Sequence, residues 1–364
     1  MKKRHVNLSI LAVLATLLFA LPATAFQLPD PDGKPADMSK KVKVFIIMGQ
    51  SNTLEMGKVK GDQEGTLEYA VKNEDLYPFM VDDAGEWTVR KDVRNVHVMG
   101  SGGPGKSSVK RNDWLTVSGG KIGIEIGIGH ELGNALDEPV LILKSAIGNR
   151  SLGWDLLPPG SPSYEYELEV KNRETKQTET KTFVYAGYGQ SPDKWEKGTQ
   201  PEPIGWKAGV QYDGDVARAK DVLENLDQFY PEATGYEVVG FLWWQGDKDR
   251  YNEGHAAMYE KNLNNLIAAL RKDFDAPNAK FVCATLGQTS KEEAAGNEKL
   301  ILDAMLSISD PAKYPELKGD VATVYTHPLS MGSASNAHYG GNAKTYMNVG
   351  LAMGKAMVEL LKNE

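Results

Sequence analysis

The sequence predicts an α/β fold in which a mainly parallel sheet is covered by helices on both faces. Short apolar runs that are partly β-branched, as in buried strands, alternate along the chain with longer segments of helical apolar spacing. This alternation favours parallel strands joined by helical crossovers. Three of the apolar runs end abruptly in a small polar turn. Because open α/β sheets bind ligands at the carboxyl ends of their strands, we expect the functional residues in these turns.

The three strand-and-turn units are residues 44–52, 139–151 and 236–247, and they end in Gly-Gln-Ser-Asn, Ile-Gly-Asn-Arg-Ser and Gln-Gly-Asp. The first unit would hold Ser51 at the edge of the sheet with its hydroxyl outward, as a nucleophilic serine requires. Taken alone, Gly-Gln-Ser-Asn is also an ordinary turn sequence, since Gly, Ser and Asn all suit turns.

Residues 42–364 are predicted to form one domain that carries an inserted region around residues 154–212. The pattern predicts further strands at residues 93–99, 280–286 and 321–325, and helices at residues 122–136, 215–229, 256–274, 291–308 and 342–361. The inserted region breaks this rhythm, because residues 164–170 alternate at period two and residues 181–186 alternate more loosely. We expect a hairpin there, followed by a loop that contains Trp195 and Trp206.

The first 25 residues resemble a secretory signal peptide. Three basic residues precede an apolar stretch at residues 8–21, and Ala23-Thr-Ala25 follows it. Cleavage is expected after Ala25, which predicts a periplasmic or extracellular protein that the apolar stretch is too short to anchor. Residues 26–41 are rich in Pro and Lys and are predicted to be a linker.

The charge balance argues against nucleic acid or an anionic membrane as a partner. The formal net charge is −8, from 41 Lys and Arg against 49 Asp and Glu, and removal of three basic residues with the leader makes it −11. The single Cys283 lies in an apolar run, where a buried and unreactive thiol is expected. No His pair has the spacing of a zinc site, so neither a metal mechanism nor a cofactor is predicted.

A Gly-rich segment at residues 100–107 satisfies the pattern of a phosphate-binding loop. Such a loop must open a helix whose amides meet the phosphate, but residues 108–116 are polar and lack helical spacing. Pro104 also removes an amide. We expect a flexible surface loop and no nucleotide site.

Acyl transfer needs a nucleophile, a base and donors directed at the developing oxyanion. Ser51 and the late His338 are candidates for the first two. Gly148, Asn149 and Gln245 are candidates for the donors, through backbone or side chain. Each of these residues also has a purely structural explanation. Gly148 and Asn149 could form an ordinary turn, Gln245 could merely end a strand, and a His before a helix is often structural.

These motifs together resemble the SGNH-hydrolase superfamily, and within it the branch of sialate O-acetylesterase-like proteins and acetylxylan esterases. The resemblance rests on Gly-Gln-Ser-Asn at residues 49–52, Ile-Gly-Asn-Arg-Ser-Leu at 147–152, Trp-Trp-Gln-Gly-Asp at 243–247 and His-Tyr at 338–339, and spans about residues 42–360. It implies a flavodoxin-like α/β/α sandwich and removal of O-acetyl groups from sugars. It also implies Ser51 as nucleophile, His338 as base, and an oxyanion hole from the Ser51 amide, the Gly148 amide and the Gln245 side chain.

One position departs from this family pattern. Members usually carry Asp three residues before the histidine, where this chain has Ser335. Ser335 cannot supply the negative charge that orients and stabilises the imidazolium. Asp247 is our candidate for the acid. Alternatively, Asp247 only caps the end of a strand and the enzyme uses a Ser–His dyad. A third possibility is a decayed site that only binds its ligand.

Substrate contacts are expected from the residues beside the nucleophile and from the inserted region. The candidates are Gln50, Asn52, Trp195 and Trp206, whereas Trp243 and Trp244 are at least as well explained as core residues. The expected substrate is an acetylated carbohydrate or polysaccharide. An esterase for non-sugar substrates is the remaining alternative.

Overall fold

A seven-stranded sheet forms the centre of the computed structural model, which describes residues 36–105 and 107–363. Its strands are β1 (Val42–Gly49), β3 (Arg90–Met99), β4 (Ser108–Leu115), β6 (Val140–Ser145), β10 (Tyr236–Trp244), β11 (Lys280–Ala284) and β12 (Val321–Val324). They lie in the order β12-β11-β10-β1-β6-β3-β4. All neighbouring pairs are parallel except β3 and β4. This confirms the predicted mainly parallel sheet.

Strand β1 occupies the middle of the sheet because its side chains are apolar on both faces. Val44 and Ile46 point into one core and Phe45 and Ile47 into the other, and all four are fully buried. A parallel strand with both faces covered requires such a continuous apolar run. The strand pairs with β6 on one side and β10 on the other.

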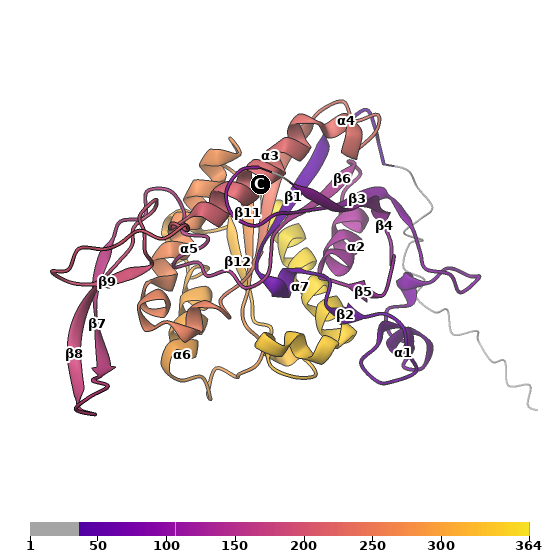
Figure 1. Cartoon of the computed structure of the whole chain (residues 1–364). Helices are drawn as coiled ribbons and strands as arrows, with labels where there is room; N and C mark the ends of the chain where they lie inside the picture. The colour runs from indigo at the N-terminus through magenta and orange to yellow at the C-terminus, as the bar shows by residue number, and fades with distance from the viewer. Residues whose placement is uncertain (1–35, 106, 364) are drawn as a thin grey trace, which may run out of the picture.

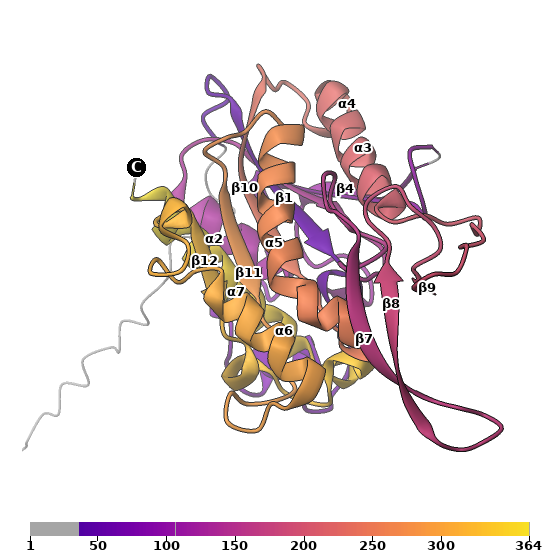
Figure 2. The same cartoon turned by 90° about the vertical axis from the view of Figure 1, so that its left-hand side faces the viewer.

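Helices cover both faces of the sheet, which confirms the α/β/α architecture (Figures 1 and 2). One face carries α3 (Val210–Glu224), α5 (Glu253–Asp273) and α6 (Gly296–Ser307), with the short α4 (Leu226–Phe229) after α3. The other face carries α1 (Leu67–Lys72), α2 (Glu125–Ala135) and α7 (Ala343–Leu361). Polar side chains cap several of these helices; for example, Asn252 accepts a hydrogen bond from the amide of His255 at the start of α5.

Helices α2 and α7 approach each other at glycines. A Cβ on Gly127 would lie 2.4 Å from the amide nitrogen of Leu351, and one on Gly350 would lie 2.4 Å from the carbonyl oxygen of Ile124. Any larger residue at either position would therefore separate the two helices. The contact therefore holds the middle of α7 close against the start of α2.

The inserted region forms a separate three-stranded sheet of β7 (Tyr164–Lys171), β8 (Thr178–Tyr185) and β9 (Lys194–Glu196). It projects from the side of the molecule next to α5 (Figures 1 and 2). Its base is fixed by polar contacts, since the Tyr164 hydroxyl donates to the carbonyl of Gly254 at 2.9 Å and His255 Nε2 lies 2.8 Å from Asp193 Oδ1. The remaining strands, β2 (Gly57–Lys58) and β5 (Lys121–Ile122), pair with each other.

Several sequence expectations need correction. Residues 108–115, for which no strand was predicted, form β4, an antiparallel edge strand whose residues are mostly exposed or half-exposed and show little apolar alternation. The Gly-rich turn before it is fixed, because the amide of Gly102 donates to Gln211 Oε1 at 2.8 Å and Arg218 Nη2 donates to the carbonyl of Gly102 at 3.3 Å. A strand follows this turn rather than a helix, so it lacks the geometry of a phosphate-binding loop.

Some helix boundaries differ from the predicted ones, and some short elements were not predicted. The helix expected at residues 215–229 begins earlier and is divided at Asn225 into α3 and α4, and α6 begins later than residue 291. The short elements α1 and β9 were not predicted. The predicted signal peptide and most of the predicted linker lie outside the described residues. Within the described residues, no helix is sufficiently long and apolar to cross a membrane.

Candidate active site

Three adjacent strands bring the predicted turns to one edge of the sheet. Because β1 lies between β6 and β10, the residues that follow these strands, including Ser51, Gly148 and Gln245, are neighbours at their carboxyl ends. Gly49 makes the first turn possible. Its φ is +145°, and a Cβ there would lie 2.6 Å from the carbonyl oxygen of Trp244 at the end of β10.

Ser51 begins the 3-10 turn η1 (Ser51–Thr53) and is half-buried. The backbone of Gly148 lies against it, since a Cβ built on Gly148 would be 3.4 Å from Ser51 Cβ. Among the described residues, the amides of Ser51 and Gly148 donate to no acceptor. Two unpaired amides beside a serine hydroxyl are the donors that an oxyanion hole requires.

His338 lies in the segment η6 (Ser335–Gly341), which packs against η1. His338 and Tyr339 both adopt left-handed backbone conformations, with φ of 51° and 53°. The buried Tyr339 holds this segment in place, because its ring stacks on Trp244 at 5.6 Å and its hydroxyl accepts the amide of Gly287 at 3.2 Å. Left-handed non-glycine residues persist only where their surroundings fix them, and they are frequent at functional sites.

Asp247 contacts Ser335, the residue at the position where the family pattern has an acid. Its side chain is mostly buried, and Oδ1 accepts hydrogen bonds from Ser335 Oγ at 2.7 Å and from Arg250 Nε at 2.8 Å. Ser335, which stands where the usual Asp would be, therefore contacts the carboxylate of Asp247. Among the described residues, Asp247 Oδ2 has no hydrogen-bond partner.

The structure thus brings Ser51, His338 and Asp247 into contacting segments without joining their side chains. Among the described residues, no hydrogen bond connects Ser51 Oγ to the His338 ring or the ring to Asp247. Catalytic hydrogen bonds are often long before substrate binds and shorten in the substrate complex.

Gln245 and Gln50 are buried and bonded to the protein. Gln245 Nε2 lies within hydrogen-bond distance of Asp249 Oδ2 at 2.6 Å, the carbonyl of Arg150 at 2.8 Å and Gln50 Oε1 at 3.1 Å. Its Oε1 accepts from the Tyr259 hydroxyl at 2.9 Å. With three acceptors around one amide nitrogen, Gln245 is placed to join the β6 and β10 turns rather than to meet an oxyanion.

Asp249 also holds together the turns that follow β6 and β10. It is fully buried, and its oxygens accept the amides of Leu152 at 2.9 Å and Gly153 at 2.8 Å as well as Gln245 Nε2. Burial raises the pKa of Asp249, and these hydrogen bonds oppose that effect. Sequence reasoning gave this residue no role, although its spacing of four from Gln245 was visible.

The other predicted substrate residues differ in accessibility. Asn149 is exposed, with a φ of 57°. Asn52 is fully buried and both polar atoms of its side chain lack a partner, so a ligand does not reach it in this conformation. Trp195 packs against the small core of the inserted region. Trp206 lies 5.2 Å from the guanidinium of Arg150, which also donates to the carbonyls of Gly148 and Asn149.

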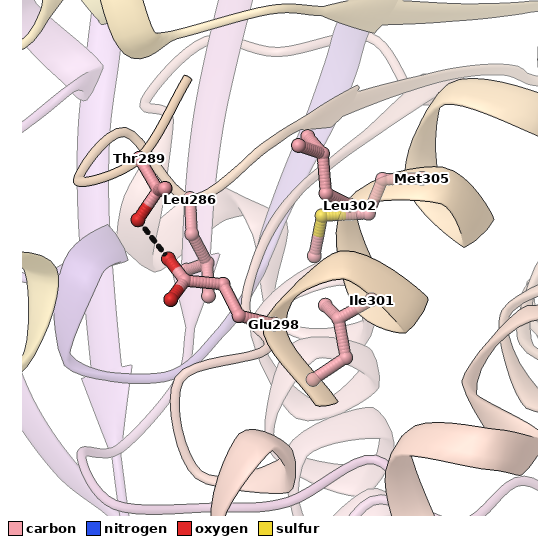
Figure 3. A pocket seen from close by; sticks show the side chains of 6 residues that line it. All are labelled: Leu286, Thr289, Glu298, Ile301, Leu302 and Met305. Atoms are coloured by element: carbon pink, nitrogen blue, oxygen red, sulfur yellow. Dashed lines mark hydrogen bonds between the residues drawn. The ribbon is translucent and has the colours of Figure 1, made fainter. Parts of the chain in front are cut away.

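A small, mainly apolar hollow lies between the segment after β11 and helix α6 (Figure 3). It is lined by Leu286, Thr289, Glu298, Ile301, Leu302 and Met305, and the Thr289 hydroxyl donates to Glu298. A Cβ on Gly246 would lie 2.8 Å from Met305 Cε, so this wall presses directly on the turn. We interpret it as packing that fixes the Gly246–Asp247 backbone.

A buried charge cluster anchors the segment after the nucleophile. Lys144 on β6 is fully buried, and its Nζ donates to Glu125 Oε2 at 2.6 Å and to Glu55 Oε1 at 3.0 Å. Burial alone would lower the pKa of Lys144, but the two carboxylates raise it. Burial alone would raise the pKa of Glu55, but Lys144 and His97 hold it well below its ordinary value of 4.5.

Lys144→Met is expected to lower the free energy of unfolding by about 3–5 kcal/mol, because it leaves the buried carboxylate of Glu125 and the partly buried one of Glu55 without their cation. Lys43→Met is the matched control. Lys43 also lies on a central strand and pairs with Glu237 at 2.6 Å, but this pair is exposed, so its loss should cost at most about 1 kcal/mol. Urea unfolding at pH 7 measures both; equal losses would contradict the anchoring role.

The loss of stability in Lys144→Met should depend on pH, because the pKa of Glu55 is lowered in the folded protein. A carboxylate with a lowered pKa contributes stability above its ordinary value and loses that contribution as the pH falls below it. The difference in the free energy of unfolding between wild type and Lys144→Met should therefore be largest at pH 7 and should decrease as the pH falls below 4.5.

Comparison with known families identifies the chain. The family described as "Carbohydrate esterase, sialic acid-specific acetylesterase" matches residues 162–359, more than half of the sequence. The chain belongs to this family. The matched part of this carbohydrate esterase contains Asp247, Ser335 and His338, whereas Ser51 and Gly148 precede it. No curated protein sequence matches.

Three solved structures are similar to this carbohydrate esterase at low sequence identity. A protein from Arabidopsis thaliana has a TM-score of 0.48 and 14% identity, with 89% of this chain and 99% of that chain covered. A carbohydrate acetylesterase from Xanthomonas citri has a TM-score of 0.48 and 14% identity over 88% of this chain and 57% of that one. NanS has a TM-score of 0.40 and 13% identity over 80% and 79% of the two chains.

Proposed function

We propose that this carbohydrate esterase removes O-acetyl groups from sugar hydroxyls, with Ser51 as nucleophile and His338 as general base. The observation that carries the proposal is the contact of η1 with η6, which brings a serine near the start of the chain and a histidine near its end to one edge of the sheet. The family of the chain supports the sugar ester as substrate class.

In the proposed reaction, Ser51 Oγ attacks the acetyl carbonyl carbon while the imidazole of His338 takes the hydroxyl proton. The amides of Ser51 and Gly148 donate to the oxyanion of the tetrahedral intermediate. This intermediate collapses, the C–O bond to the sugar breaks, and His338 returns the proton to the leaving sugar oxygen. Water, deprotonated by His338, then attacks the acetyl-enzyme; the bond to Ser51 Oγ breaks, His338 returns the proton to that oxygen, and acetate leaves.

Asp247 is proposed to orient His338 through Oδ2, since Oδ1 already accepts from Ser335 and Arg250. Gln245 is proposed as a positioning residue that holds the β6 and β10 turns together, in place of the oxyanion donor expected from the sequence. The proposal includes one esterase domain over residues 42–364 with an inserted region, and export directed by residues 1–25.

The test combines labelling with product analysis. A fluorophosphonate should modify the wild type at Ser51, identified by peptide mapping, because an activated serine attacks phosphorus as it attacks an ester carbon. Acetate release from acetylated xylan, O-acetylated sialic acid and a lipid ester then separates sugar esters from other esters. Labelling of a different serine would reject the nucleophile, and hydrolysis of the lipid ester alone would reject the substrate class.

A catalytically silent sugar-binding protein is the second candidate. Two observations favour it: Ser335 replaces the usual acid, and no hydrogen bond joins the three candidate side chains in the described structure. Binding of an acetylated glycan without acetate release or fluorophosphonate labelling would select this alternative.

A further inference from the structure

Tyr251 presents an aromatic ring beside the candidate active site. It ends the 3-10 turn η3 (Asp249–Tyr251), which begins two residues after Asp247. Tyr251 is 65% exposed, the largest exposed fraction of any large hydrophobic residue in the described part of the chain. A single exposed apolar residue is common and by itself indicates nothing. Its surroundings distinguish this one.

The exposed ring is held by several contacts. The Tyr251 hydroxyl accepts hydrogen bonds from Arg250 Nη2 at 3.0 Å and from Asn336 Nδ2 at 3.2 Å. The guanidinium carbon of Arg250 lies 4.9 Å from the ring centroid. The other end of η3 is fixed by the fully buried Asp249. An exposed aromatic ring that is held this firmly loses little further freedom when a ligand stacks on it.

These contacts also connect the ring to the candidate catalytic residues. Arg250 Nε donates to Asp247 at 2.8 Å, and Asn336 lies two residues before His338 in η6. The ring therefore stands at the rim of the site, on the side of β10. Pyranose rings have apolar C–H faces that pack against aromatic rings, and sugar sites are commonly lined by such residues.

We propose that Tyr251 is a stacking platform for a sugar ring of the glycan substrate, next to the unit whose acetyl group is removed. This inference rests on the proposed function, because it takes an acetylated carbohydrate as the ligand. It assigns Tyr251 to substrate binding and gives it no chemical role in ester cleavage.

The experiment measures glycan binding in a Ser51→Ala background, where turnover does not consume the ligand. The probe is whichever of two glycans the wild type deacetylates, an acetylated xylo-oligosaccharide or an O-acetylated sialyl-oligosaccharide. Adding Tyr251→Ala should raise Kd by about fivefold to tenfold, the value of one aromatic stacking contact. Adding Tyr251→Phe should keep Kd within about twofold, because the ring remains.

Tyr236→Ala is the matched control. Tyr236 is the second exposed tyrosine, at 40%, but it begins β10 and lies at the opposite end of that strand from Gln245. Its removal should leave Kd unchanged. The platform is rejected if Tyr251→Ala binds as tightly as its parent, or if Tyr251→Phe weakens binding as much as Tyr251→Ala, which would indicate that the hydroxyl contacts shape the site.

Failure of the proposed function has a different signature. If the wild type deacetylates neither glycan while it hydrolyses a small aryl acetate, the proposed sugar substrate is wrong, and the proposed role of Tyr251 is rejected with it. If the wild type deacetylates one glycan and only the Tyr251 series fails, the function stands and the platform alone is wrong.

Discussion

Ser51→Ala is expected to lower kcat for a small aryl acetate by about 10⁶-fold, because no other group in the site replaces the proposed nucleophile. His338→Ala should cause a comparable loss. The double variant should be no slower than either single variant, since a nucleophile and its base act as one unit. Steady-state kinetics at pH 7.5 with each purified variant measures these effects.

His327→Ala is the matched control for the base. His327 also follows the last strand, but its Nδ1 lies 2.9 Å from the carbonyl oxygen of Gly287, which indicates a structural role. Its loss should leave kcat within about an order of magnitude, as for one hydrogen bond to the backbone. A Ser51→Ala enzyme that retains most of its turnover, or a base effect at His327 instead of His338, would refute the assignment.

Asp247→Asn is expected to lower kcat by about 10⁴-fold if Asp247 orients His338, because an amide in this place favours the wrong imidazole tautomer. Ser335→Ala should have a smaller effect, about tenfold to a hundredfold, since it removes one hydrogen bond to the Asp247 carboxylate. Wild-type turnover in Asp247→Asn would instead indicate a Ser–His dyad.

Ser335→Asp sharpens this test. The family pattern alone predicts that restoring the usual acid improves the enzyme, but Ser335 is buried and lies 2.7 Å from Asp247 Oδ1. Two carboxylates this close share a proton, so the higher of the two apparent pKa values of the pair rises. We therefore expect lower activity at pH 7 than in the wild type, and a stability that falls as the pH rises because the folded state binds the extra proton more tightly.

The sequence predicted the strands and the long helices because their signals are local. β10 was placed at its observed boundaries, since its largely apolar run ends in a polar turn. β4 was missed because an edge strand on the rim of a parallel sheet needs no apolar alternation. The early start of α3 was missed because residues that precede the apolar stripe form its first turn.

The candidate site was predicted as a set of residues but not as a set of contacts. Ser51, Gly148 and Asp247 follow strands that are neighbours only in the folded sheet, so their motifs were visible while their roles depended on tertiary geometry. The contact of Ser335 with Asp247 spans 88 positions and has no local signal. The burial of Asn52 and the internal bonding of Gln245 likewise depend on neighbours from distant segments.

The position of β1 in the middle of the sheet has a consequence for how the protein is made. Val42 pairs with Tyr236 and Lys43 with Val140, so the first long strand to leave the ribosome waits for partners encoded much later. During that interval its apolar residues and open edges are available to other chains. Early pairing or shielding of this segment would lower the risk that the nascent chain aggregates before η1 and η6 come into contact.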